Sequence, residues 1–240
     1  MPASETASTW ALEKGLFIDE RMKRLGIRHG VTARTLGDMQ HVGRRRAALA
    51  GAGVVTEAHF LKQVHGTVII DVPAASAPEA GAAADGWITA SPKTALGVYA
   101  ADCLPLFVWE RRGRAAGVFH SGWRGTALGM PGKAVAAFSQ RYGIEPRDLQ
   151  AAVGPHIGPC CYKVGSDLEG RFRAESFSRE AGILRLDLGA EARSQLLSAG
   201  LAEEDVSVSD ACTSCQTQLL FSFRRDKTGS RMMAFLWIDR

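Results

Sequence analysis

The sequence predicts an α+β fold with mixed β-sheets, because short apolar strands, a hairpin and helical segments alternate along the chain. The hairpin is indicated by two apolar runs, 104–110 and 114–119, which flank a short polar turn containing Gly113. Helices are indicated over 126–142, which carries spaced apolar residues, and over 189–199. Each of these helices is followed directly by a glycine, a common helix stop.

Five further segments have the composition of strands. Residues 67–72, 95–100 and 149–153 are short and mainly apolar. Residues 184–188 alternate leucine with polar side chains, as expected for a half-buried strand. The run 232–238 (MMAFLWI) is apolar throughout, so we expect it to be buried on both faces of a sheet.

The length of 240 residues suits one large domain or two small ones. Residues 73–84 are rich in Ala, Pro, Ser and Gly and are expected to form a surface loop. No low-complexity linker or clear repeat divides the chain. We therefore expect a single domain over residues 1–240, in which residues 1–28 form an N-terminal extension that is partly strand.

The charge balance is mildly basic, with a net charge of +4 and a pI near 8.9. Short arginine runs fit a solvated surface or an anionic small ligand such as phosphate, and no motif points to nucleic acid. No apolar run reaches the roughly 18 residues of a membrane-spanning helix, and residues 1–13 do not resemble a signal peptide. We expect a cytoplasmic protein with a small-molecule substrate and no membrane partner, acting as a monomer or small homo-oligomer.

The chain has five cysteines, an odd number that suits a reducing compartment rather than a disulfide framework. Cys160 and Cys161 are adjacent, and Cys212 and Cys215 form a CxxC pair. A closed zinc site at this pair would need two more ligands, which are distant in sequence. A redox role would need a βαβ context, so we expect structural or incidental thiols here.

His65, Cys103 and His120 lie in three compact motifs, KQVHG, ADCLP and HSGWRG. Two imidazoles and one thiol form a metal-ligand set that leaves a fourth position open. Structural zinc sites usually close with four protein ligands, whereas catalytic sites keep one position for water or substrate. The pattern therefore predicts a catalytic zinc site.

The predicted hairpin offers a geometric test of this set. A turn centred near Arg111 and Arg112 would place Cys103 directly opposite His120, with Cβ atoms about 4.5–5.5 Å apart. At that separation a thiol and an imidazole can share one metal ion or one proton. The alternative is a buried cysteine beside a core histidine.

Six stretches of the chain resemble the YfiH-type family, also described as laccase-domain or polyphenol-oxidase-like proteins. They keep the family's order and span most of the chain from residue 62 onward. The stretches are KQVHG (62–66), ADGWIT (84–89), ADCLP (101–105), HSGWRG (120–125), VGPHIGPCCYKVG (153–165) and CTSCQTQLLFSFRRDKTG (212–229).

The resemblance implies a four-layer α/β/β/α arrangement and a metal site formed by His65, Cys103 and His120, with zinc as the metal and copper as an alternative. It also implies phosphorolysis of adenosine, inosine and methylthioadenosine, and adenosine deamination; some members are linked to peptidoglycan precursor editing. The chain departs from the family after Arg34, where a Gly-rich stretch is missing.

For a zinc-dependent purine nucleoside enzyme, deamination requires an acid that protonates the leaving amine, and Asp102 and Asp85 are the candidates. Phosphorolysis requires a phosphate clamp, for which guanidinium groups are suited by their bidentate geometry. The expected clamp and substrate contacts are Arg34, Arg46, Arg124, Lys62 and Gln63.

The sequence is also compatible with three other function classes. A metal-free hydrolase would use Cys103 as nucleophile and His120 as base, and would not need His65. A copper-dependent polyphenol oxidase is disfavoured because only six histidines occur in the chain, too few for the usual multicopper centres. A binding protein without catalytic activity is the last alternative.

Overall fold

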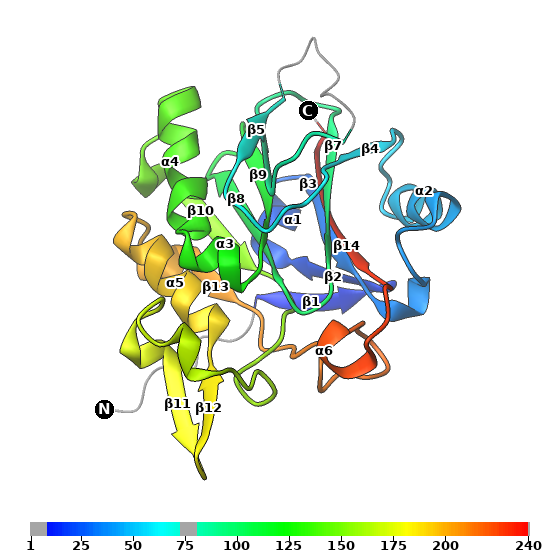
Figure 1. Ribbon diagram of the computed structural model, residues 1–240. Helices are drawn as coiled ribbons and strands as arrows, with labels where there is room; N and C mark the ends of the chain where they lie inside the picture. The colour runs from blue at the N-terminus through cyan, green and yellow to red at the C-terminus, as the bar shows by residue number, and fades with distance from the viewer. Residues whose placement is uncertain (1–8, 73–80, 240) are drawn as a thin grey trace.

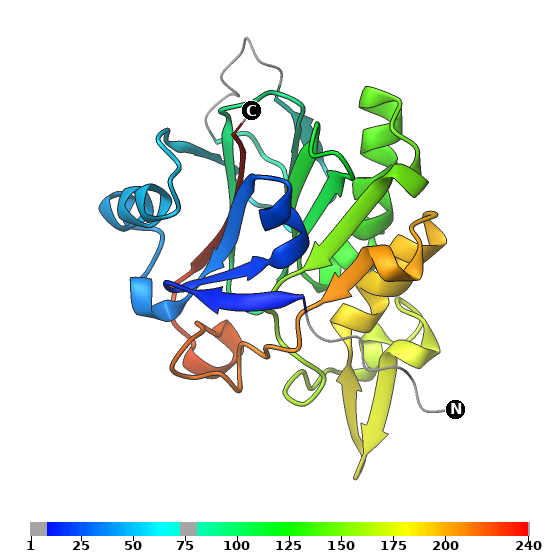
Figure 2. The ribbon, with the colours of Figure 1, turned by 180° about the vertical axis from the view of Figure 1, so that it is seen from behind.

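The computed structural model describes residues 9–72 and 81–239, which form two six-stranded sheets packed face to face with helices on both outer sides (Figures 1 and 2). Helix α2 covers the outer face of one sheet, and α3, α4 and α5 lie against the other. This is the expected α+β fold in a four-layer α/β/β/α arrangement. In the described residues, no helix is both long and apolar enough to cross a membrane.

The first sheet has strand order β1-β2-β3-β14-β7-β4 and is mixed, since β4 is parallel to β7 and the other pairs are antiparallel. Strand β14 lies in its centre and is buried along its whole length, which confirms the expectation from its unbroken apolar run. The strands are β1 (Trp10–Glu13), β2 (Leu16–Asp19), β3 (Ile27–Thr32), β4 (Ala58–Phe60), β7 (Ala95–Ala100) and β14 (Met232–Ile238).

The second sheet has strand order β13-β10-β8-β9-β6-β5 and is also mixed. Its strands are β5 (Ile69–Asp71), β6 (Gly86–Thr89), β8 (Leu104–Glu110), β9 (Ala116–Ser121), β10 (Leu149–Val153) and β13 (Val206–Val208). A separate hairpin is formed by β11 (Phe177–Glu180) and β12 (Ile183–Leu186).

The helices are α1 (Glu20–Arg24), α2 (Val42–Gly51), α3 (Trp123–Ala127), α4 (Met130–Tyr142), α5 (Leu188–Ser198) and α6 (Phe223–Asp226). Short 3₁₀ turns are η1 (Arg34–Leu36), η2 (Pro146–Asp148), η3 (Ser166–Leu168), η4 (Ala174–Ser176) and η5 (Glu203–Asp205). After Arg34, the chain passes through η1 and Gly37 directly towards α2.

Several predicted elements have bounds that differ from the expectation. The strands expected over 114–119 and 67–72 are Ala116–Ser121 and Ile69–Asp71, and the helix expected over 189–199 is Leu188–Ser198. The single helix expected over 126–142 is two helices, because Gly129 adopts a left-handed φ of 82° between α3 and α4. The strand expected over 184–188 ends at Leu186, because the Asp187 side chain accepts a hydrogen bond from the Ala190 N–H and caps α5.

Three apolar layers hold the architecture together. Large aromatic side chains such as Trp87, Phe107 and Trp109 fill the space between the two sheets. Phe138 of α4 packs in the layer beneath the second sheet, and Leu49 of α2 packs in the outer layer of the first sheet. Truncation of such buried aromatic side chains costs about 3–5 kcal/mol in other proteins, so these layers fix where the strand ends lie.

A buried ion pair joins the two sheets at one edge. Asp19 at the end of β2 is fully buried and lies 3.0 Å from the Arg21 guanidinium. Arg21 also donates to the Ala151 carbonyl of β10 at 2.9 Å and to the Ser207 hydroxyl. Burial raises the pKa of Asp19, but the bonds from Arg21 and neighbouring hydroxyls outweigh it, so that the pKa lies below its ordinary value.

Candidate metal centre

His65, Cys103 and His120 meet where the chain passes between the two sheets. His65 lies between β4 of the first sheet and β5 of the second, and Cys103 lies between β7 of the first and β8 of the second. His120 is the fifth residue of β9. One ligand atom from each lies within 4.8 Å of the others, and the two imidazole centroids are 4.9 Å apart at an angle of 81°.

The register of the β8–β9 hairpin corrects the prediction for Cys103. The strands pair Leu104 with Ser121 and Pro105 with His120. Extending this register by one residue places Cys103 opposite Gly122, not opposite His120. The difference arises at the turn, where Gly113 takes a φ of 72° and shifts the centre by one residue. Because the offset from His120 is two positions, the thiol and the imidazole still lie on the same face.

Gly122 makes room for the cluster. A Cβ atom at this position would lie 2.8 Å from the Cys103 Sγ and 3.1 Å from the Cδ2 of His65. No larger residue fits without displacing a ligand. Gly122, the first glycine of HSGWRG, is therefore required by the geometry of the site. The sequence pattern alone did not show this role.

Asp85 fixes the orientation of His120. The β6–β9 register pairs Gly86 with Phe119, so Asp85 lies directly opposite His120 and accepts from its Nδ1 at 2.8 Å. The same carboxylate accepts from the backbone N–H groups of Val64, His65 and Gly66. Burial raises the pKa of Asp85, but these donors lower it below its ordinary value, so it stays ionised and leaves the Nε2 of His120 for the cluster.

The electrostatics favour a thiolate at Cys103. Burial alone would raise the pKa of Cys103, but the adjacent His120 and His65 lower it to about 6. Burial would lower the pKa of His120, whereas Cys103 and Asp85 raise it to about 9. The pair is therefore a thiolate beside an imidazolium when no metal is present, and a metal ion would replace the imidazolium proton.

Two residues of this region have left-handed backbones that non-glycine residues seldom adopt: His65 at φ 60° and Asp102 at φ 85°. Such conformations cost about 1–3 kcal/mol each and persist where surrounding contacts hold them. The Asp102 carboxylate accepts from the Thr213 hydroxyl and from the Arg224 N–H, both at 2.6 Å. Both of its oxygens are engaged, so the contacts of Asp102 suit holding Cys103 in place.

The three predicted arginines lie in different surroundings. Arg124, exposed on α3, follows β9 directly, and its guanidinium stacks 4.6 Å from the ring centroid of Trp123. Arg34 donates to the Thr217 carbonyl at 3.1 Å, near α6. Arg46 lies on α2, on the outer side of the first sheet, where it forms an exposed ion pair with Glu57. The structure thus brings Arg124 next to the ligand strand and leaves Arg46 in another layer.

Lys62 and Gln63 belong to the segment that leads to His65. The Gln63 amide donates to the Tyr99 carbonyl at 2.8 Å and accepts from the Tyr99 N–H at 2.7 Å. This reciprocal pair attaches the segment to β7 of the first sheet. The Lys62 backbone N–H donates to the Ala82 carbonyl, and its side chain is exposed.

Sequence reasoning did not single out Tyr162, and it considered Arg224 only as part of a short arginine run. Burial and the neighbouring Cys103 thiolate raise the pKa of Tyr162 to about 12, so its phenol stays protonated. The Arg224 guanidinium lies 5.0 Å from the centroid of this ring. Tyr162 lies in the stretch CCYKVG and Arg224 in the stretch FRRDKTG. These two motifs were the sequence signal from which both residues could have been found.

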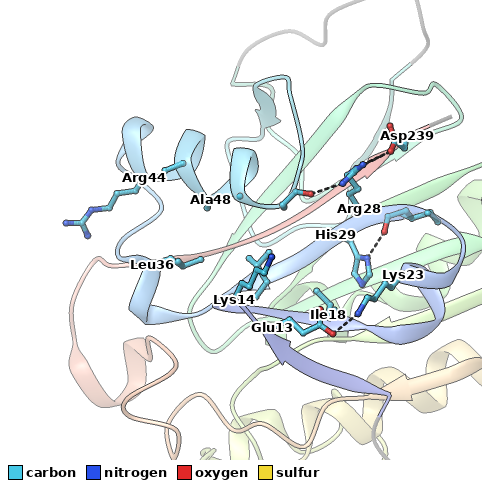
Figure 3. Close-up of a pocket in the computed structure, with 16 residues that line it drawn as sticks. Glu13, Lys14, Ile18, Lys23, Arg28, His29, Leu36, Arg44, Ala48 and Asp239 are labelled. Atoms are coloured by element: carbon cyan, nitrogen blue, oxygen red, sulfur yellow. Dashed lines mark hydrogen bonds and ion pairs between the residues drawn. The ribbon is translucent and has the colours of Figure 1, made fainter.

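The cavity in Figure 3 lies elsewhere. It has a volume of about 620 Å³ between α2 and strands β1–β3, and Lys14, Ile18 and Arg44 are among its lining residues. None of the metal ligands or predicted substrate residues lines it. This cavity is therefore separate from the cluster of His65, Cys103 and His120.

The fold and this cluster define a four-layer α/β/β/α protein with a candidate two-histidine, one-cysteine metal centre. The chain belongs to the family described as "multi-copper polyphenol oxidoreductase laccase", whose model matches residues 28–239. It is 32% identical to a protein of Shigella flexneri named "Purine nucleoside phosphorylase YfiH", over 82% of this chain and 81% of that one. It is 35% identical to a "Purine nucleoside phosphorylase" of Xylella fastidiosa (strain 9a5c), over 82% of this chain and 78% of that one.

The same relationship is found in three dimensions. The crystal structure of YlmD from Geobacillus stearothermophilus superposes with a TM-score of 0.87 and 29% identity, covering 98% of this chain and all of that one. Both comparisons confirm the YfiH-type relationship expected from the sequence motifs.

Proposed function

We propose that this protein is a zinc-dependent purine nucleoside phosphorylase acting on adenosine, inosine or methylthioadenosine. The observation that carries the proposal is the convergence of His65, Cys103 and His120 within 4.8 Å. Among the residues described, no other His, Cys, Asp or Glu joins this group, so a bound ion keeps an open position. The names of the relatives support the reaction class.

His65, Cys103 and His120 would hold the ion, which supplies Lewis-acid chemistry at its open position by polarising a substrate, phosphate or water oxygen. The donor set favours zinc, although copper binds nitrogen and sulfur ligands tightly. The rings of His29 and His156 are buried and bonded to backbone groups, which leaves one histidine-containing cluster among the described residues. A multicopper centre needs several such clusters.

Phosphorolysis breaks the bond between ribose C1′ and the purine nitrogen, forms a bond from C1′ to a phosphate oxygen, and gives the leaving purine a proton. Arg124 is suited to phosphate because its exposed guanidinium has no acidic partner among the residues the structure describes. Trp123 beside it is half-buried and offers a face for the purine. Phe119, the other aromatic residue near this strand end, is fully buried and is not available for stacking.

Adenosine deamination at the same centre is a second proposed activity, in which water replaces the amine at purine C6 and ammonia leaves. Both carboxylates considered as the acid, Asp102 and Asp85, are occupied by hydrogen bonds. We assign Asp102 and Asp85 positioning roles. We expect deamination to be slower than phosphorolysis, because neither carboxylate is free to donate a proton to the leaving amine.

The metal-free hydrolase is kept as a competitor because the structure contains the geometry of a triad. Asp85 accepts from His120 Nδ1 at 2.8 Å, and His120 in turn lowers the pKa of Cys103. His65 distinguishes the two proposals, since a nucleophilic cysteine with a histidine base does not use a second imidazole.

The test is to measure the metal content of the purified protein and its release of purine base from adenosine and inosine, with and without phosphate. We expect about one zinc at this centre per chain and phosphate-dependent base release, both lost in His65→Ala and Cys103→Ala. His41→Ala, at an exposed histidine outside the cluster, is the matched control. No base release from a zinc-loaded protein would contradict the proposal, and a Cys103-dependent hydrolysis that survives His65→Ala would favour the competitor.

A further inference from the structure

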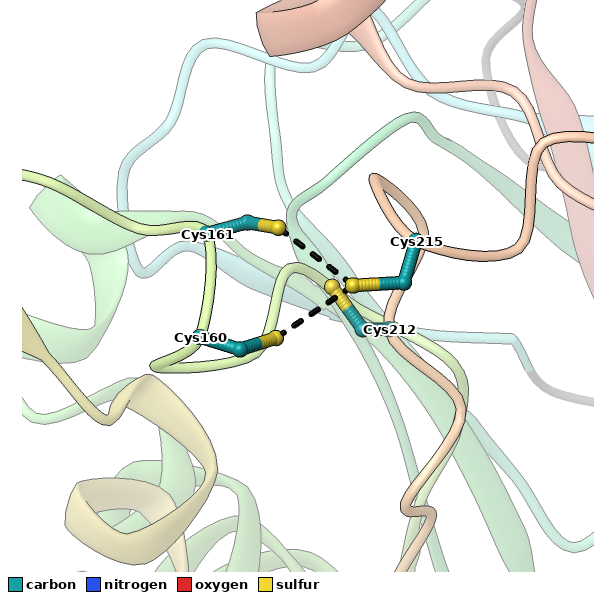
Figure 4. Close-up of side chains that lie close together, drawn as sticks. All are labelled: Cys160, Cys161, Cys212 and Cys215. Carbon is teal, nitrogen blue, oxygen red and sulfur yellow. Dashed lines mark hydrogen bonds between the residues drawn. The ribbon is translucent and has the colours of Figure 1, made fainter.

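The other four cysteines form a second cluster. Cys160 and Cys161 lie on the segment after β10, and Cys212 and Cys215 lie on the segment after β13. Figure 4 shows all four side chains pointing towards one another, and their Sγ atoms all lie within 4.8 Å. A closed site at the CxxC pair needs two more ligands. Cys160 and Cys161 supply them, from a segment about fifty residues away in the chain.

Two of the sulfur separations are close to those around a single tetrahedral ion. Cys215 Sγ lies 3.5 Å from Cys160 Sγ and 3.4 Å from Cys161 Sγ. Four zinc–sulfur bonds of about 2.3 Å in a tetrahedron place the sulfurs about 3.8 Å apart. A disulfide requires about 2.05 Å, so these sulfurs are spaced for a shared ion rather than a bond.

The cluster has the supporting contacts of a built site. The Gly158 N–H donates to Cys212 Sγ at 3.2 Å, as a donor stabilising a thiolate would. A Cβ atom on Gly158 would lie in van der Waals range of Cys160 Sγ at 3.4 Å and of Cys212 Sγ at 3.6 Å, so the Gly158 backbone runs directly beside two of the four thiols.

Two arginines brace the two cysteine segments. Arg185 donates to the carbonyl of Cys160 at 2.5 Å. Arg225 donates to the carbonyls of Thr213 and Ser214, between the two CxxC cysteines, at 2.7 and 3.0 Å. Four thiolates with one divalent cation carry a net charge of −2, which the Arg185 guanidinium partly offsets. The charge of Arg225 is already paired with Asp226, which accepts from it at 2.6 and 2.7 Å, so Arg225 acts here through its bonds to the backbone carbonyls.

We propose that Cys160, Cys161, Cys212 and Cys215 bind one structural zinc ion, separate from the centre at His65, Cys103 and His120. Four soft thiolates in a closed tetrahedron are the donor set of structural zinc. The formation of the site releases thiol protons and leaves no position for a substrate.

This second ion would support the first centre through Asp102. Both cysteine segments contact that residue: the Ile157 N–H donates to its carbonyl at 3.0 Å, and the Thr213 hydroxyl donates to its carboxylate at 2.6 Å. Asp102 precedes Cys103 and holds the left-handed φ of 85°. An ion that clamps the two segments together therefore stabilises the backbone that presents Cys103.

The test is a zinc count by elemental mass spectrometry on full-length protein purified under reducing conditions. We expect two zinc ions per chain in the wild type and one in Cys215→Ser, whose side chain is exposed, with Ser214→Ala as the matched control. The double variant His65→Ala/Cys103→Ala should also keep one zinc, which separates this inference from the proposed function. Its cobalt-substituted form should show the thiolate-to-cobalt charge-transfer bands of a tetrahedral four-sulfur site.

Should Cys215→Ser fail to fold, Cys160→Ser and the cobalt spectrum of the double variant give the same information. A zinc-free double variant would overturn the proposal. An iron ion in place of zinc at these four cysteines would overturn it as well.

Discussion

Asp85 lies directly opposite His120 across the β6–β9 pair, and its carboxylate accepts from His120 Nδ1 at 2.8 Å while also receiving three backbone N–H groups. The Asp85 carboxylate thus holds both the backbone around His65 and the imidazole ring of His120. The arrangement determines which imidazole nitrogen faces Cys103.

The first prediction concerns this contact. Asp85→Asn removes the charge that fixes His120, and loss of such a contact typically lowers metal affinity by about 10–100-fold. Competition with a chelator of known affinity measures the change. Asp210→Asn, at an exposed carboxylate, should leave the affinity unchanged. Equal affinities in the wild type and Asp85→Asn would refute a positioning role for Asp85.

The second prediction concerns the space at Gly122. Gly122→Ala places a methyl group 2.8 Å from Cys103 Sγ, so we expect loss of the metal at this centre while the fold is retained. Circular dichroism and metal content measure the two effects. Gly43→Ala on α2 is the control, because its Cβ meets nothing within 4 Å and should be neutral or slightly stabilising. A Gly122→Ala protein with full metal content would show that the cluster tolerates a side chain here.

The third prediction follows from the lowered pKa of Cys103. A thiol reacts as the thiolate, so in metal-free protein its alkylation should reach half its maximal rate near pH 6, where an ordinary thiol is almost unreactive. Peptide mass spectrometry distinguishes Cys103 from the other cysteines. His120→Ala removes the main stabilising charge and should move the midpoint upward. An unchanged midpoint in that variant would show that His120 does not stabilise the thiolate.

The fourth prediction concerns the buried pair of Asp19 and Arg21. Asp19→Ala should cost about 3–5 kcal/mol of unfolding free energy, because it leaves a largely buried guanidinium without its partner. Glu13→Ala, which breaks a solvent-exposed pair with Lys23, should change the unfolding free energy far less than Asp19→Ala. Urea denaturation compares the two variants. A similar small cost in both would mean that the Asp19 pair adds little to the fold.

The Asp19 pair should also depend on pH in a defined direction. The folded pKa of Asp19 is lowered, so its contribution is fully present above the unfolded pKa of about 3.9 and is lost as pH falls through the lower folded value. The difference in stability between wild type and Asp19→Ala should therefore shrink below about pH 4. A difference that stays constant into stronger acid would contradict this account.

Much of the fold was predictable because apolar runs mark strands clearly. The segments 95–100, 104–110, 149–153 and 232–238 were predicted with the bounds that the structure has. The break between α3 and α4 was not predictable. Its left-handed residue, Gly129, lies within a segment whose apolar residues continue on both sides. The hairpin register was missed for a similar reason: the conformation of Gly113 decides which of two turn centres is used.

The site was predictable in part. Its three metal-ligand candidates could be chosen by residue chemistry and motif, and the structure brings them together. Long-range contacts could not be derived from one sequence, because they depend on which loops the two sheets place at the same end. The gathering of Cys160 and Cys161 with the CxxC pair, and the attachment of Asp102 to Thr213, are of this kind.

The most direct test of the central claim is phosphate-dependent release of hypoxanthine from inosine, measured on the wild type before and after removal of its metal and again after zinc is restored. We predict release with formation of ribose 1-phosphate, its loss on metal removal and its recovery with zinc, and no recovery in Cys103→Ala. Release that continues unchanged in metal-free protein, or that needs no phosphate, would contradict a zinc-dependent phosphorylase at His65, Cys103 and His120.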